Sequence, residues 1–539
     1  MKLTKKISVF VGLSWLGLSL VGCGASPTQE TAPAPQQPYT DNQQPEDDQL
    51  EISTQVNLGG DLVWVSVSDA VSFDPHRVND IPSMVFQAQV FQGLLSFDEA
   101  GNFVPVLATD FRQLDDYVWE FDLREGVYFH DGTLFNAEAV VMNFERILDP
   151  NPSFPIPASN IKDMITSTVA VDDYTVHITT AFPFAPLPGH LTPMGSFIIA
   201  PSAIQAERDG IAYINENPIG TGPFILHERI HGDQTTFVRN ETYWGGAPYV
   251  DSLTIRVIPD AGTRLSMLET GETHGFTGTA IDLPSVRTMA NANYFTIPSA
   301  ATEYIGFNTE RGPLANPLVR QAISYAIDRA EMVTLMEGLG LPAISMAGPT
   351  IAFAPSGLSV VEQDLDHARE LLAQTPYADG LELSIWVNDG SSIRANIAEL
   401  TQFYLAQIGI SLTIENIVWS SYLDAINALE HDMFVLNWVA TTGDADRAFH
   451  PLFHSENRGS LGNRFGYSNP LVDELIEQGR RATVAAERYA IYEDIAAILA
   501  EDVPMLPLWH IVTPYFYNGV SGIRLDFRSI PYFARVSID

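Results

Sequence analysis

Cysteine is almost absent from this chain, because Cys23 is the only one in 539 residues. A single thiol cannot form a disulfide within the chain, so packing and polar contacts must stabilise the fold. Long apolar runs are scarce as well, and none after residue 22 approaches the roughly 20 residues of a membrane-spanning helix. With 46% hydrophobic residues, the composition predicts a globular body with a large buried core.

Basic residues are also few. The chain has 28 Lys and Arg against 66 Asp and Glu, which gives a formal net charge of −38. A surface of this sign repels polyanions, which argues against a nucleic-acid partner and against binding to anionic lipid. The length suggests two or three domains.

Signatures of common enzymes and cofactor sites are missing. The stretch GTGPF at residues 220–224 lacks the GK[ST] of a phosphate loop, and Pro223 removes an N–H that such a loop would need. No GxSxG or HExxH motif occurs. His450 and His454 have a spacing that can hold a metal on a helix, but Pro451 between them argues against a regular helix. We therefore expect no catalytic site, no metal and no cofactor.

The first residues are typical of an export signal. Lys2, Lys5 and Lys6 precede an apolar run at residues 7–20 that is too short to span a bilayer comfortably. Leu20, Val21 and Gly22 before Cys23 resemble the lipobox of bacterial lipoproteins, whose signal is cleaved before a lipid-carrying cysteine. The resemblance implies a signal peptide at 1–22 and a lipid anchor on Cys23. The protein would then lie outside the cytoplasm, on the outer face of the cell membrane, or in the periplasmic space of a host with two membranes.

Two kinds of segment follow. Residues 23–55 are rich in Pro, Gln, Thr and acidic residues, which predicts a disordered tether. From residue 56 onward, β-branched segments alternate with amphipathic ones, which predicts an α/β fold. We expect strands at 60–68, 173–180, 251–259, 381–387 and 410–419, and helices at 316–338, 364–374, 391–409 and 488–502.

A collinear series of segments resembles the family 5 extracellular solute-binding proteins, which serve peptide and nickel ABC importers. The series opens at residues 90–147 and continues with NPIGTGPFIL, RNETYWGGAPYVDSLTIRVIP, IGFNTERGPLANPLVRQAISYAIDR, FGYSNPLVDELIEQGRR and RYAIYEDIAAILAEDVPMLPLW. The resemblance implies a two-lobed periplasmic-binding-protein-like fold with hinge strands. Lobe I would comprise residues 56–88, 217–302 and 512–539, an inserted domain 89–216, and lobe II 303–511.

One loop of that family helps to decide the ligand. Its dipeptide and oligopeptide binders place an aspartate three residues after a tryptophan, where the carboxylate pairs with the peptide amino terminus. Here Trp438 is followed at that distance by Thr441, which cannot form an ion pair. The stretch TGDADRAFHPLF resembles instead the glutathione-binding subgroup, whose ligand is a zwitterion. Thr441 and Thr442 would supply hydrogen bonds, while Asp444 would either bind the ammonium group or cap the following helix.

Four further residues are candidate ligand contacts. Arg394 is expected at a strand-to-helix crossover, where its guanidinium could bind a carboxylate or simply be solvated. Arg77 and Ser83 belong to the stretch that corresponds to the family's cleft floor. Tyr304, like Trp438, offers a flat apolar surface for stacking on peptide planes, with core packing as the alternative.

The resemblance thus implies a monomeric, non-catalytic receptor that closes over glutathione or a short peptide. It would deliver this solute to a membrane permease energised by an ATPase subunit. Alternatives are a nickel-chelate or heme ligand, as in other members of the family, and a signalling lipoprotein that senses peptides without importing them. An extracellular hydrolase would need a nucleophile or metal site that the sequence lacks.

Overall fold

The computed structural model describes residues 57–78, 80–150, 161–459 and 462–539. The expectations for the signal peptide, Cys23 and the tether lie outside these residues. Within them, strands and helices alternate along the chain, which confirms the α/β class. All five predicted strands are present, as β1 (Asp61–Ser66), β7 (Thr175–Thr180), β10 (Ser252–Val257), β14 (Leu381–Asn388) and β15 (Ile410–Ile417).

An eleven-stranded mixed sheet organises the described chain. Ten of its strands follow the order β15-β14-β16-β12-β17-β11-β1-β10-β9-β8, and β13 pairs beside β17. The strands not yet given are β8 (Phe224–Ile230), β9 (Gln234–Arg239), β11 (Gly275–Thr277), β12 (Asn293–Phe307), β13 (Gly340–Pro342), β16 (Met433–Val439) and β17 (Met505–Tyr517).

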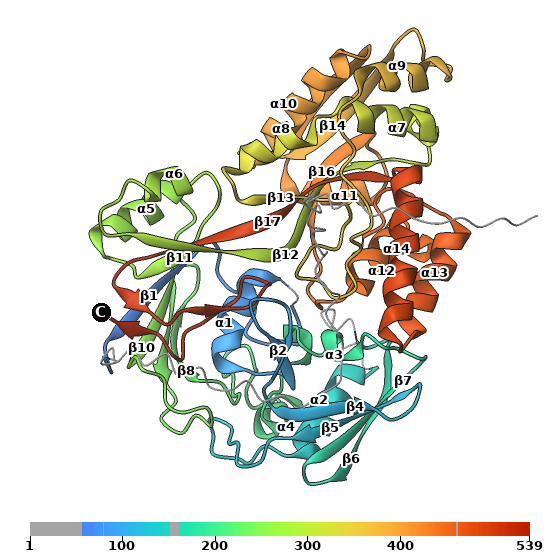
Figure 1. Ribbon diagram of the computed structural model, residues 1–539. Coiled ribbons are helices and arrows are strands. Elements are labelled where there is room, and N and C mark those ends of the chain that lie inside the picture. The colour runs from blue at the N-terminus through green and yellow to red at the C-terminus, as the bar shows by residue number, and fades with distance from the viewer. Residues whose placement is uncertain (1–56, 79, 151–160, 460–461) are drawn as a thin grey trace, which may run out of the picture. The chain divides into compact units, whose positions relative to one another are not determined.

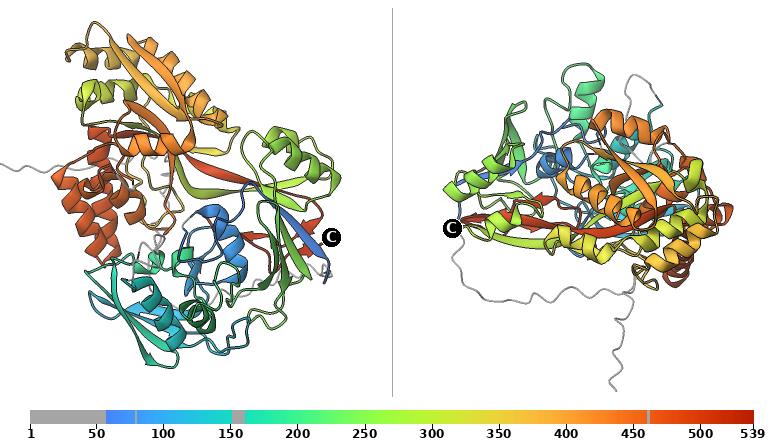
Figure 2. Two further views of the ribbon diagram at one scale, coloured as in Figure 1. Left: turned by 180° about the vertical axis from the view of Figure 1, so that it is seen from behind. Right: turned by 90° about the horizontal axis from the view of Figure 1, so that it is seen from above.

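The two longest strands, β12 and β17, join the two ends of this sheet. They pair antiparallel from Asn293–Tyr517 to Gly306–Met505, with a register shift between Pro298 and Thr302. Figure 1 and the left view of Figure 2 show the two strands side by side. In the sheet, β12 is followed by β16 and β17 by β11. The predicted boundaries at residues 302 and 511 fall inside these two strands, whereas the one at residue 88 falls inside helix α1 (Ile81–Val90).

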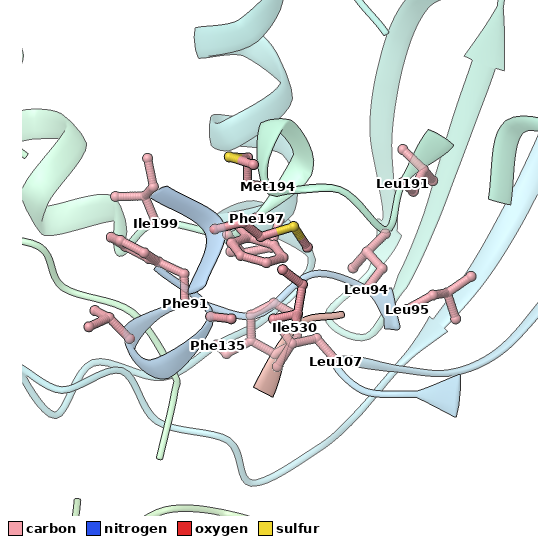
Figure 3. Close-up of a cluster of buried hydrophobic side chains, with 14 of the residues drawn as sticks. Phe91, Leu94, Leu95, Leu107, Phe135, Leu191, Met194, Phe197, Ile199 and Ile530 are labelled. Atoms are coloured by element: carbon pink, nitrogen blue, oxygen red, sulfur yellow. The ribbon is translucent and has the colours of Figure 1, made fainter. Parts of the chain in front are cut away.

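Within residues 89–216, four strands form a separate antiparallel sheet, in the order β4-β5-β7-β6. Its other strands are β4 (Ala108–Gln113), β5 (Val118–Leu123) and β6 (Ile165–Asp172), and its helices are α2 (Ala137–Leu148), α3 (Leu187–His190) and α4 (Pro201–Arg208). Apolar side chains of this region pack with Ile530 from the C-terminal segment, as Figure 3 shows for Phe91, Leu107 and Phe135. This packing joins the region to the end of the chain.

Helices cover the other end of the main sheet. The predicted helices at 364–374, 391–409 and 488–502 are confirmed as α9 (Leu365–Ala373), α10 (Ser392–Ala406) and α14 (Ala485–Asp502). The single helix predicted at 316–338 is wrong, because the chain forms α7 (Pro317–Ala326), α8 (Arg329–Val333) and the short turn η3 (Thr334–Met336). Asp328 causes the break, since its side chain accepts a hydrogen bond from the Glu331 amide and starts a new helix.

Further helices and short strands complete the described fold. Helices are α5 (Ala261–Thr270), α6 (Leu283–Val286), α11 (Trp419–Asn427), α12 (Asp446–Phe453), α13 (Pro470–Arg481), η1 (Met194–Ser196), η2 (Gly312–Ala315) and η4 (Ser455–Asn457). Strands are β2 (Leu95–Phe97), β3 (Phe103–Pro105), β18 (Val520–Ser521), β19 (Arg524–Leu525), β20 (Pro531–Tyr532) and β21 (Ser537–Ile538). No helix among the described residues is long and apolar enough to cross a membrane.

Candidate ligand-binding site

The end of β16 and the loop after it carry four of the predicted ligand residues. Trp438 lies near the end of β16, opposite Thr302 of β12, and the chain then runs through Thr441, Thr442 and Asp444 into α12. In open α/β sheets, ligands bind beyond the carboxyl ends of strands. The loop therefore lies where such a fold places binding residues, next to a strand that joins the two ends of the sheet.

A proline in α12 explains how Trp438 is held. Pro451 has no N–H, so the carbonyl of Arg447 one turn earlier loses its helical donor. The indole Nε1 of Trp438 donates to that carbonyl at 2.7 Å, and the Arg447 guanidinium covers the indole ring at 5.2 Å from its centroid. The helix runs through His450 and Pro451 but ends at Phe453, so the regular helix through both His450 and His454 that Pro451 argued against does not form. The tryptophan satisfies the carbonyl that the proline leaves without a donor.

Asp444 is held by a buried arginine. Its two carboxylate oxygens accept hydrogen bonds from Arg488 at 2.7 and 2.8 Å, and one of them also accepts the Asp446 amide at 2.9 Å. Burial by itself would lower the pKa of Arg488, but the Asp444 carboxylate outweighs it and raises that pKa. Both roles predicted for Asp444 stay predictions, and a ligand ammonium would have to share oxygens that Arg488 already uses.

The loop is approached closely by residues 187–190. Thr442 is buried, and its hydroxyl has no hydrogen-bond partner. A Cβ built on Gly189 would lie only 2.3 Å from the Thr442 carbonyl oxygen, so only glycine fits there. Thr441 is partly exposed and its amide donates to the Val439 carbonyl.

A contact between His190 and Asp446 spans this approach, and an ion pair of Asp446 lies beside it. His190 lies 3.3 Å from the Asp446 carboxylate, which Arg480 of α13 also approaches at 3.2 Å. Burial alone would raise the pKa of Asp446, but the charge of Arg480 and the hydrogen bond from His190 hold it well below the usual range. Asp446 is therefore charged and joins α12 to both α3 and α13.

Arg394 lies beside the same strands but is already paired. Its guanidinium donates to Glu303 at 2.8 Å, to Asn388 at 2.6 Å and to Asn437 at 3.0 Å. Tyr304 is fully buried against the rings of Phe434 and Phe465, and burial raises its pKa to about 12. Ligand contact by either residue stays a prediction.

Arg77 and Ser83 belong to a different network. Arg77 pairs with Asp74 at 2.9 Å and with Glu207 at 3.4 Å, and the same two carboxylates bind the buried Arg146. Ser83 is buried at the start of α1. Its hydroxyl donates to Asp80 at 2.8 Å and accepts the Val71 amide at 2.9 Å. The predicted residues thus form one group around Trp438 and a second one at residues 74–83.

His450 of α12 and His454, which follows the helix directly, lie in a charged cluster. The rings of His450 and His454 are 5.1 Å apart, and one ligand atom each from His450, His454 and Glu456 lies within 4.8 Å of the others. Arg480 approaches His450 Nε2 at 3.0 Å, which places a positive charge beside these ligand atoms. The guanidinium and a metal ion would compete for His450.

A cavity of about 770 Å³ lies elsewhere. Residues 215–219, 225–229 and 231 line it together with Val71, His130 and Asp131. The predicted ligand residues are not among the side chains that line it.

Several residues of the Trp438 group were not predicted, and three of them differ in the signal that they carry. Glu303 stands inside a buried run of β12, and a charge in such a run signals a buried partner. No sequence pattern indicates the contact between Arg447 and the Trp438 indole, because this contact depends on Pro451 and on the fold. Gly189 lies in the stretch PLPGH, which gives no sign of contact with a loop some 250 residues later.

Sequence comparison relates the chain to known proteins. Residues 102–460 match the family described as bacterial extracellular solute-binding proteins, family 5 middle region. The glutathione-binding protein GsiB of Shigella dysenteriae is 32% identical over 461 residues, which cover 83% of this chain and 88% of that protein.

Solved structures confirm the two-lobed fold. The periplasmic binding protein DppA from Helicobacter pylori, in complex with the peptide STSA, aligns with a TM-score of 0.76 and 28% identity, over 89% of this chain and 98% of that one. NikA from Brucella suis, in complex with Fe(III)-EDTA, aligns with a TM-score of 0.78 and 25% identity, over 89% of this chain and 100% of that one.

Proposed function

The chain belongs to the family 5 bacterial extracellular solute-binding proteins, and we propose that it captures glutathione or a short peptide outside the cytoplasm. It would hand this solute to the permease of an ABC importer. The observation that carries the choice of glutathione is the loop after Trp438. Thr441 offers no charge, and the nearby carboxylate of Asp444 is engaged by Arg488, so a bare peptide ammonium has no free partner there.

The protein binds its solute in this proposal without changing it. Trp438, Thr441 and Thr442 contact the ligand, whereas Asp444 and Arg394 hold the loop and strands in place through Arg488 and Glu303. Arg77, Ser83 and Tyr304 support the site from the adjoining segments. No catalytic group is required of any of them.

Closure follows from the connections between the two ends of the sheet. Only β12 and β17 join them within the main sheet, so bending in these strands would move one end relative to the other. The contacts of Gly189 with Thr442 and of His190 with Asp446 would form as the protein closes. A monomer suffices for this movement.

Calorimetric titration of the full chain tests the proposal. The panel is reduced glutathione, a dipeptide, a pentapeptide, a nickel–histidine chelate and heme. We expect saturable 1:1 binding of glutathione, and we expect Thr441→Asp to weaken it while improving binding of ordinary peptides. Binding of ordinary peptides alone would leave a general peptide receptor, and silence from all peptides would overturn the proposal.

The nickel chelate is in the panel because of one observation. NikA, which binds Fe(III)-EDTA in its structure, resembles this chain as well as some peptide binders do. Binding of the nickel–histidine chelate without any peptide would favour that second function.

A lipid on Cys23 would hold the protein at the membrane, as the sequence before this cysteine suggests. Metabolic labelling with radioactive palmitate in a bacterial host tests the anchor. We expect label in the wild type and none in Cys23→Ala, while an unlabelled wild type would remove this part of the proposal.

A further inference from the structure

The guanidinium of Arg447 is without a partner in a protein that has acids in excess. It is partly buried against the indole of Trp438, and its Nε is buried with no hydrogen-bond partner. In the described part of the chain, no carboxylate, carbonyl or hydroxyl forms a hydrogen bond or ion pair with this side chain. Leaving a buried N–H of a guanidinium without an acceptor is costly, so the arrangement needs an explanation.

Other buried arginines of the described chain have polar partners, although the Nε atoms of Arg264, Arg329 and Arg480 are also buried without a hydrogen bond. Arg264, Arg320 and Arg329 donate to backbone carbonyls or to a serine hydroxyl. Five others pair with carboxylates at 2.5–3.2 Å, namely Arg146, Arg394, Arg480, Arg488 and Arg528. With 66 acidic residues available, the missing partner of Arg447 is not a matter of supply.

The surroundings make an unpaired cation less favourable still. Arg447 lies in the first turn of α12, where the helix dipole disfavours positive charge. Burial lowers its pKa, and the neighbouring Asp446 offsets this only in part, because that carboxylate is bound by His190 and Arg480. An external anion would supply the missing charge.

The side chain is nevertheless well positioned. The backbone carbonyl of Arg447 accepts a hydrogen bond from Trp438 Nε1, because Pro451 cannot donate to that carbonyl. The Arg447 guanidinium lies over the same indole ring. The loop that leads to it holds the Thr442 hydroxyl, which is buried and also lacks a partner. A cation and a hydroxyl without partners therefore accompany Trp438 in one short segment.

We propose that Arg447 binds a carboxylate of the solute, with Trp438 as the platform that orients the guanidinium. The solute is then an acid, such as a peptide with a free carboxylate, rather than a neutral or amidated one. This inference rests on the proposed function, since it names the class of solute that the same site takes.

The experiment is a double-mutant-type cycle, in which the side chain at position 447 and a carboxylate of the ligand are each removed, alone and together. Glutathione, its glycyl monoethyl ester and its diester, and one tripeptide with a free or an amidated C-terminus, are titrated into four full-length proteins. These are the wild type, Arg447→Met, Arg447→Lys and the control Arg481→Met, whose arginine is exposed and pairs with Glu477 on α13. Circular dichroism and the melting temperature of each free protein show whether it is folded.

We expect Arg447→Met to weaken binding of the acids roughly tenfold to a hundredfold. Arg447→Lys should weaken it less, and Arg481→Met should not affect it. Blocking the contacted carboxylate should weaken binding to the wild type by a similar factor and binding to Arg447→Met hardly at all. The free Arg447→Met protein should melt no lower than the wild type. Equal losses from blocking in wild type and Arg447→Met would overturn the inference, as would unchanged binding by that variant.

A wild type that binds neither glutathione nor any peptide would overturn the proposed function, and a second panel then decides the subsite. Citrate, succinate and the nickel–histidine chelate are compared by the rise in melting temperature. A rise in the wild type that Arg447→Met lacks would support the anion subsite with another solute. No rise in the wild type, or the same rise in both proteins, would overturn it.

Discussion

The buried pair of Asp444 and Arg488 gives the sharpest prediction for a single residue. Asp444→Asn would leave the Arg488 charge uncompensated, and the free energy of unfolding should fall by about 3–5 kcal/mol. Asp366→Asn is the control, because Asp366 is 93% exposed and pairs only with Arg369 on the surface. Urea denaturation measures both. A variant at position 444 that is as stable as the control would show that the pair does not hold the loop.

These residues also show how far the sequence could go. The stretch TGDADRAFHPLF pointed to Asp444, and the expected crossover pointed to Arg394. Their partners stand 44 and 91 residues away, at Arg488 and Glu303. Local patterns carry no information about such distant pairs. The candidate residues were therefore predictable, but the partners that already bind their side chains were not.

Helix α12 depends on its proline in an unusual way. Pro451→Ala would restore an N–H that can donate to the Arg447 carbonyl, in competition with Trp438 Nε1. We expect an equally stable or more stable fold, and solute binding weakened several-fold because the indole is held less firmly. Calorimetry measures the affinity and thermal denaturation the stability.

Pro470→Ala is the matched control for this change. Pro470 starts α13, where its missing N–H has no helical acceptor, so the substitution should leave affinity unchanged. If both variants bind the solute as the wild type does, the proline does not position Trp438.

Helices and strands were predictable where their signals are local. The alternation of β-branched and amphipathic segments placed all five expected strands and three of four helices. The fourth was wrong although its signal was present, because Asp328 and Glu331 form the D-x-x-E pattern of a helix start. The helical spacing of apolar residues 318–327 predicted one helix that continued through that cap.

Buried histidines predict how stability changes with pH. Burial lowers the pKa of His76 and of His510 to about 4 and that of His431 to about 3. The unfolded chain, with histidines near 6.5, binds these protons first, so acidification favours unfolding. Each histidine should cost roughly 1.4 kcal/mol for every pH unit between 6.5 and its folded pKa.

Urea denaturation at pH 7.5, 6 and 5 measures this loss. His431→Phe is the informative variant, because His431 packs against Trp386 and Phe434 and an apolar ring can replace it. The variant should lose less stability on acidification than the wild type. Equal losses would mean that His431 does not resist protonation in the fold, since carboxylate titration is common to both proteins.

The arrangement of the whole sheet could not be derived from local pattern. β12 and β17 pair although about 200 residues separate them along the chain, and their pairing depends on everything between. Only the collinear resemblance to a family implied the two lobes and the hinge. Physical reasoning from composition and periodicity reached the α/β class and went no further.

The central claim is that the loop after Trp438 binds a peptide-like solute, and calorimetric titration of glutathione into wild type and Trp438→Leu tests it most directly. Trp419→Leu serves as the control, since Trp419 is partly exposed on α11 and stacks on Tyr422. The account predicts 1:1 binding to the wild type and the control, with affinity at least tenfold weaker in Trp438→Leu. Equal affinity in all three proteins, or no binding by the wild type, would contradict it.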